Sequence, residues 1–235
     1  MNAELIRMRK NKKLDIKITG GVKKISQDIL SERIFSLNTN MVELFDINAN
    51  PKSTISDYAR NIVKSICLVL ELFSEMDIYP DYFYDIYFRA NEEFRDKASN
   101  GEVNGRGSLY EAPGFRANIS SMMENGITNG NYRLNPNRVK NISDYYNEMV
   151  SFSRRYYLPC EVSTVEMCRE MFSDIWTECN NCINYLGIRP YISDDVELLS
   201  RLLFEYVRFF AAVGINPEDY LNSEIENQSK LGKSK

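Results

Sequence analysis

Three carboxylates spaced four residues apart form the most suggestive chemical pattern in this chain: Glu166, Glu170 and Asp174. Residues at that spacing lie on one side of a helix, so their side chains face the same way. Hard oxygen ligands of this kind suit Mg²⁺, which can bridge phosphates and activate water. The solvated face of an amphipathic helix carries the same pattern, and exposed carboxylates are common. From the residues alone we favour the solvated face, and the same holds for Glu197 farther along the chain.

A second pattern joins basic and amide side chains to a segment with glycines at positions 101, 105 and 107. Its polar residues are Arg89, Asn91, Arg95 and Arg106. Glycine-rich backbone can turn its N–H groups toward an anion, so the segment fits a phosphate-binding loop. A flexible connector after a charged helix end fits the same residues equally well.

Composition narrows the chemistry further. The chain has no histidine, which excludes Ser-His-Asp and Cys-His catalysis and the usual imidazole-ligated metals. Its net charge of −4 disfavours nucleic-acid binding, which needs concentrated positive charge. No apolar run is long enough for a membrane span to be expected. Five cysteines without an export signal indicate a cytoplasmic protein with reduced thiols. Cys179 and Cys182 lack a second close cysteine pair, so buried thiols are favoured over zinc.

Hydrophobic periodicity predicts an all-α helical bundle. We expect helices over residues 26–46, 57–77, 80–98, 141–157, 164–186, 194–213 and 218–229. The predicted N-caps are Ser56 or Asp57, Ser163 or Thr164, and Ser193 or Asp194. The chain then divides into a basic N-terminal arm (1–24), a first helical unit (25–98), a Gly-rich loop or connector (99–138) and a second helical unit (139–231).

The two units align as an internal repeat at a constant offset of 137 residues. The matching pairs are Asp57 and Asp194, Phe73 and Phe210, Ile78 and Ile215, and Pro80 and Pro217. Each unit has a capped apolar helix, an Ile-x-Pro break and a polar-aromatic helix. A helix pair that cannot bury its apolar face alone is expected to pack on its copy, so the sequence predicts one bundle of two tandem units.

Two segments resemble the all-α nucleoside triphosphate pyrophosphohydrolases, the MazG-like and dimeric dUTPase superfamily. FRANEEFRDKASNGEVNGRGSLY (88–110) is similar to that family's Lys-Asn-x-x-Asn-x-x-Arg helix and the glycine-rich phosphate-side loop behind it. FEYVRFFAAVGINPEDYLNSEIE (204–226) resembles its helix, Gly-Ile-acidic turn and following helix. The helix order in each half fits the family's four-helix plan, and the resemblance covers residues 26–110 and 141–230.

The resemblance implies Mg²⁺-dependent hydrolysis of a nucleoside triphosphate to the monophosphate and pyrophosphate, and a homodimer. The implied metal ligands are Glu166, Glu170 and Glu197, with Glu170 also the catalytic residue. The implied substrate contacts are Arg89, Asn91, Arg95 and Arg106.

Several positions depart from the family's metal motifs. Thr39–Glu43 stands where the family has Glu-Glu-x-x-Glu and keeps one glutamate. Asn61–Lys64 stands at the Glu-x-x-Asp motif and places a cation where a metal carboxylate belongs, and Glu197–Ser200 loses the aspartate. These changes favour an alternative function, a catalytically inactive relative that acts as a nucleotide-binding or protein-interaction module. A helical interaction module unrelated to nucleotides is a third class.

Overall fold

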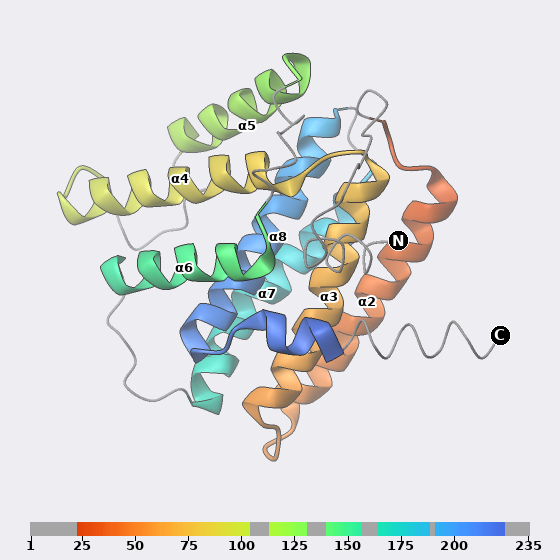
Figure 1. Cartoon of the computed structure of the whole chain (residues 1–235), viewed down its shortest axis with the longest axis vertical. Coiled ribbons are helices and arrows are strands. Elements are labelled where there is room, and N and C mark those ends of the chain that lie inside the picture. The colour runs from red at the N-terminus through yellow and green to blue at the C-terminus, as the bar shows by residue number, and fades with distance from the viewer. Residues whose placement is uncertain (1–22, 104–112, 131–139, 157–163, 189–190, 224–235) are drawn as a thin grey trace.

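A computed structural model describes residues 23–103, 113–130, 140–156, 164–188 and 191–223 (Figure 1). The described residues form helices and no strand, which confirms the predicted all-α class. The labelled helices are α2 (Gln27–Ala49), α3 (Ile55–Glu75), α4 (Pro80–Ser99), α5 (Pro113–Thr128), α6 (Ile142–Tyr156), α7 (Val165–Tyr185) and α8 (Ile192–Val213). A shorter helix spans 217–223. Within these ranges no helix is long and apolar enough to cross a membrane.

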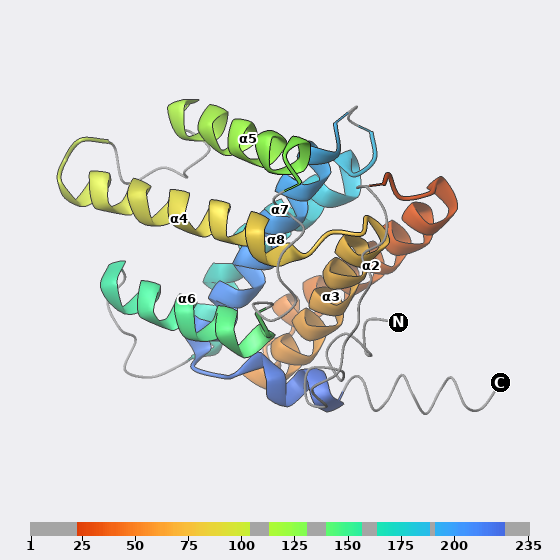
Figure 2. The same ribbon diagram turned by 45° about the horizontal axis from the view of Figure 1, so that its top comes forward.

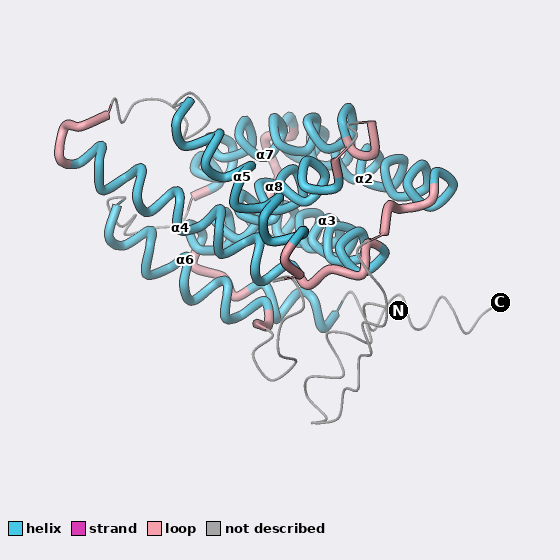
Figure 3. Tube along the Cα trace, turned by 90° about the horizontal axis from the view of Figure 1, so that it is seen from above, coloured by secondary structure: helices cyan, strands magenta, loops and turns pink. Residues whose placement is uncertain are grey.

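Helix α8 is the centre of the bundle. It is apolar on most sides, and it packs against α3, α4, α5, α6 and α7. Figures 1 and 2 show α4, α5 and α6 on one side of α8, with α2 and α3 on the other. A view from above shows the same division (Figure 3). Helix α2 packs against α3 and α7, so its inner side is buried although it does not touch the central helix extensively.

The observed helix starts agree with the predicted caps in one case of three. Thr164 caps α7 by accepting a hydrogen bond from the Met167 amide, as predicted. Helix α3 is capped by Thr54, not by Ser56 or Asp57, because Thr54 and Asp57 form a reciprocal capping box. The prediction for α8 is also wrong, since α8 starts after Tyr191 without a side-chain cap.

The prediction of an irregular connector over 99–138 is wrong for residues 113–128, which form α5. This helix packs on α4 and α8 and buries Ile119 and Met123, one turn apart. Its Gly126 lies so close to the Tyr82 ring that a Cβ at this position would collide with it. Close tertiary packing therefore explains a helix in a segment whose glycines disfavour one.

Helices α3 and α8 end in the same way. The amide of Ile78 donates to the Phe73 carbonyl at 3.0 Å, and the amide of Ile215 donates to the Phe210 carbonyl at 3.1 Å. Both bonds close a left-handed turn of the Schellman type. The residues in left-handed backbone are Asp77, with a φ of 61°, and Gly214, with a φ of 67°.

Candidate functional site

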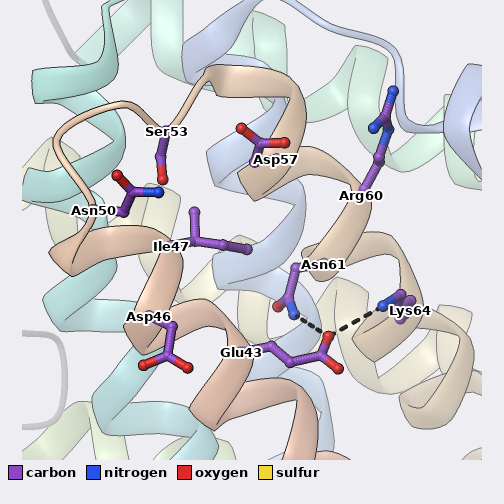
Figure 4. A pocket seen from close by; sticks show the side chains of 9 residues that line it. All are labelled: Glu43, Asp46, Ile47, Asn50, Ser53, Asp57, Arg60, Asn61 and Lys64. Atoms are coloured by element: carbon purple, nitrogen blue, oxygen red, sulfur yellow. Dashed lines mark hydrogen bonds and ion pairs between the residues drawn. The ribbon is translucent and has the colours of Figure 1, made fainter.

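The α2–α3 hairpin brings Glu43 of α2 against two side chains of α3. Its Oε2 accepts a hydrogen bond from the Asn61 Nδ2 at 3.2 Å and lies 3.1 Å from the Lys64 Nζ (Figure 4). The same Asn61 amide also donates to the Asn40 carbonyl at 3.0 Å. Two polar groups of α3, an amide and an ammonium, therefore meet at one carboxylate oxygen of α2.

The capping box explains why α3 presents these residues to α2. Asp57 accepts hydrogen bonds from the amide and the hydroxyl of Thr54, at 2.9 and 2.8 Å, which fixes where the helix begins. These bonds from Thr54 hold the pKa of Asp57 below its usual range. Asn61 and Lys64 follow Asp57 by four and seven residues, so all three lie on one side of α3.

An open pocket of about 440 Å³ lies beside this cluster, toward the turn between α2 and α3. It is lined by Glu43, Asp46, Ile47, Asn50, Ser53, Asp57, Arg60, Asn61 and Lys64 (Figure 4). Two of its carboxylates are already engaged, Glu43 by Lys64 and Asp57 by the cap. Asp46 and the exposed Arg60 add one further charge of each sign.

This donor set does not fit Mg²⁺. The ion requires near-octahedral oxygen coordination, whereas the Glu43 oxygen is shared between an ammonium and an amide. An ammonium beside the carboxylate would also repel a divalent cation. Lys64 and Arg60, which lie among three carboxylates, can instead contact the anionic part of a water-soluble ligand, and the neighbouring amides and hydroxyl can hydrogen-bond to its polar groups.

No family model, curated protein or solved structure matches the chain. The resemblance to the MazG-like superfamily therefore stays a prediction.

The predicted metal ligands of the second half are not brought together. Glu166 is 73% exposed on α7 and lies 3.6 Å from the Arg169 guanidinium, and Glu170 is exposed as well. Glu197 is buried on α8, where it accepts a hydrogen bond from the Ser120 hydroxyl of α5 at 2.8 Å. Among the described residues, no group of three or more His, Cys, Asp or Glu side chains could hold a metal ion. The exposed positions on α7 agree with a solvated acidic face.

The predicted phosphate contacts have different surroundings. Arg89 is exposed, whereas Asn91 is buried and donates to the Tyr87 carbonyl of its own helix at 2.9 Å. Arg95 is half-buried, with its guanidinium carbon 5.4 Å from the centre of the Phe94 ring. Arg106 lies outside the described residues, as do two of the three loop glycines. Arg89, Asn91 and Arg95 all belong to α4, away from the α2–α3 pocket.

The pocket itself was not predicted as a site, although the chain contained a signal for it. Arg60 and Lys64 are spaced four apart, which places two cations on one side of a helix. The position of Glu43 opposite these two cations depends on how the two antiparallel helices pack.

Cys179 and Cys182 are buried free thiols, as the sequence favoured. Burial raises the pKa of Cys179 to about 12.

Proposed function

We propose that the chain is a catalytically inactive MazG-like helical protein that binds a nucleotide at the α2–α3 pocket without Mg²⁺. The observation that supports this proposal is the position of Lys64, whose ammonium lies 3.1 Å from Glu43. In the resembling enzymes, these two motif positions carry carboxylates that hold the metal. A lysine there supplies fixed positive charge that can attract phosphate directly.

The pocket has the properties that such a ligand needs. Its volume of about 440 Å³ lies within the usual range of small-molecule sites. Lys64 and Arg60 contact the phosphates, and the polar side chains of Asn50 and Ser53 contact the sugar or the base. A charge-assisted hydrogen bond contributes roughly 1.5–3 kcal/mol, so loss of the Lys64 contact weakens binding about tenfold or more.

The proposal includes two tandem helical units, and two observations support it. The left-handed turns at Asp77 and Gly214 lie 137 residues apart and carry equivalent hydrogen bonds. Lys64 and Arg201 are also 137 apart, and each forms an ion pair with a glutamate of the preceding helix. The glutamate partners, Glu43 and Glu178, are two positions out of this register, which different packing of α2 and α7 can accommodate.

The deciding experiment measures nucleotide binding and pyrophosphate release together. The purified chain is mixed with a panel of nucleoside triphosphates, in Mg²⁺ or in EDTA. We expect one nucleotide to bind per chain, with equal affinity in both buffers and no release of pyrophosphate. At a ligand concentration of about 100 times Kd, binding adds roughly 2.7 kcal/mol to the free energy of unfolding. For a chain of this size the melting temperature should rise by about 5–10 °C.

At the same ligand concentration Lys64→Gln should reduce this shift by about half or more, as a tenfold loss of affinity requires, and Lys97→Gln is its matched control. Lys97 also pairs with a glutamate on the surface, and the two lysines are equally exposed, at 40%. Pyrophosphate release that requires Mg²⁺ would overturn the proposal in favour of the hydrolase. An unchanged melting temperature with every nucleotide would favour the third class, a helical interaction module unrelated to nucleotides.

A further inference from the structure

The outer face of α2 and α7 carries an aromatic strip that is distinct from the α2–α3 pocket. The Phe45 ring lies 5.6 Å from Trp176 and 6.3 Å from Phe172, and these two rings of α7 lie 5.5 Å apart. Phe45 is about half exposed, while Phe172 and Trp176 are partly buried. The rings form a shallow apolar seam along the line where α2 and α7 meet.

Two more residues extend this seam along α2. Val42 precedes Phe45 by three residues and is 53% exposed, and Phe35 precedes Val42 by seven and is 72% exposed. A spacing of seven keeps two residues on one side of a helix. The strip from Phe35 to Phe45 is therefore about 15 Å long, since a helix rises ~1.5 Å per residue. The opposite side of α2 is buried, so this helix has apolar residues on two sides.

The strip lies within an acidic surface. Helices α2 and α7 together contain eight carboxylates and two arginines. Asp28, Glu32, Asp46, Glu166 and Glu170 are all exposed on these two helices. The two arginines are Arg33 and Arg169, and both lie beside a glutamate at 3.6 Å. Three of the eight carboxylates, Glu43, Asp174 and Glu178, pair with cations of α3 and α8. The five exposed carboxylates still outnumber the two arginines, so the surface around the strip is acidic.

We infer that this face is a docking surface for a basic amphipathic helix of a partner protein. Such a helix lays its apolar side on the Phe35–Phe45 strip, and its flanking lysines and arginines meet the carboxylates. The negative charge of this face disfavours a second copy of the chain, anionic lipid and nucleic acid as occupants. A second copy of the chain would place one acidic face on another, and anionic lipid or nucleic acid would be repelled in the same way.

The test uses a synthetic amphipathic peptide of leucine and lysine, roughly 18 residues long so that it can form a stable helix. A peptide in which glutamate replaces every lysine is the control ligand. Trp176 is the chain's single tryptophan, so a peptide that covers it should shift its emission to shorter wavelength. We expect the lysine peptide to bind and to weaken as salt increases, and the glutamate peptide not to bind.

The variant Phe35→Ser/Val42→Ser should weaken the lysine peptide about tenfold, as expected for two apolar contacts at an interface. Both side chains are exposed, so the fold should tolerate the change. Asp28→Asn/Glu32→Gln should weaken binding and reduce its salt dependence. Met122→Ser is the matched control, because Met122 is an exposed apolar residue on the distant α5 and should have no effect.

Three results would overturn the inference. Equal binding of the lysine and glutamate peptides would show that charge does not select the partner. Unchanged binding by the Phe35→Ser/Val42→Ser variant would place the peptide elsewhere. Sedimentation of the free chain as a dimer that this variant dissociates would assign the face to a second copy. None of these outcomes depends on nucleotide binding.

Discussion

Glu205 provides the clearest link between this structure and a measurable pH dependence. It lies in the seam between α7 and α8, where its Oε2 is 2.7 Å from the Arg208 Nη2. Loss of hydration by burial raises the pKa of Glu205 from 4.5 to about 7. Arg208 opposes this shift, whereas the carboxylates of Asp174 and Glu178 add to it. At neutral pH the folded protein therefore holds a carboxyl group that ionises only at a cost.

The sign and size follow from proton linkage. Below pH 4.5 the carboxyl is protonated in both the folded and the unfolded chain. Between pH 4.5 and about 7 the folded chain retains the proton that the unfolded chain has lost, so the free energy of unfolding falls as pH rises. The difference between 4.5 and about 7 corresponds to roughly 3 kcal/mol, since one pKa unit is about 1.4 kcal/mol. Above pH 7 this group contributes no further change.

The assay compares urea unfolding of the native chain and of Glu205→Gln at pH 5 and pH 8. Glutamine cannot ionise, so the variant should gain stability relative to the native chain by about 2.5 kcal/mol between the two pH values, since part of the effect is already present at pH 5. Glu32→Gln, at an exposed position, is the control and should show a much smaller change. If Glu205→Gln and the native chain differ by the same free energy of unfolding at both pH values, burial does not raise the pKa of Glu205 and the reasoning is refuted.

Three further changes test the pocket and the helix ends. Glu43→Gln should tighten nucleotide binding about fivefold, measured by titration. The substitution removes a carboxylate that repels phosphate and that pairs with Lys64. Weaker binding would instead favour a metal site that needs Glu43. Gly214→Ala should lower the free energy of unfolding by about 1–2 kcal/mol in urea, because alanine is strained in left-handed backbone; an unchanged value would contradict that strain. Asp77→Gly should raise the free energy of unfolding by about 0.5 kcal/mol, because Asp77 has the same left-handed backbone as Gly214 but carries a side chain. A lower free energy of unfolding would mean that contacts of the Asp77 side chain stabilise the fold by more than the backbone strain costs.

Periodicity was sufficient to predict most helices, because apolar spacing depends only on which face each helix buries. It failed for α5, where Ile119 and Met123 are the fully buried apolar side chains among those that the structure describes, and where Gly126 allows the close approach of Tyr82. This packing depends on both α4 and α5, so neither segment alone has a sequence pattern that predicts helix α5. The same limit explains the α8 start, which has no side-chain cap to recognise.

The site predictions were limited for a related reason. Helical spacing correctly placed Glu166 and Glu170 on one side of α7, but it could not say whether that side meets another helix. Glu197 was a candidate ligand because it stands at the family's Glu-x-x-Asp motif. Its contact with Ser120 could not be predicted, since Ser120 belongs to a segment expected to be a loop. The substitution of Lys64 was visible in the sequence, yet its contact with Glu43 follows only from the packing of α2 on α3.

The proposed repeat explains why one binding site is expected per chain instead of two. Lys64 with Glu43 and Arg201 with Glu178 both join the second helix of a hairpin to the first. The first pair has side chains 40% and 48% exposed, whereas those of the second are 14% and 13% exposed. Water and a ligand can reach the first pair, while a phosphate approaching Arg201 would have to displace packed side chains. The second pair is then structural, because removing either partner would leave a largely buried charge without compensation. Under the proposal, the same cation–carboxylate contact serves ligand binding in one unit and helix packing in the other, and the exposure of the pair decides between the two roles.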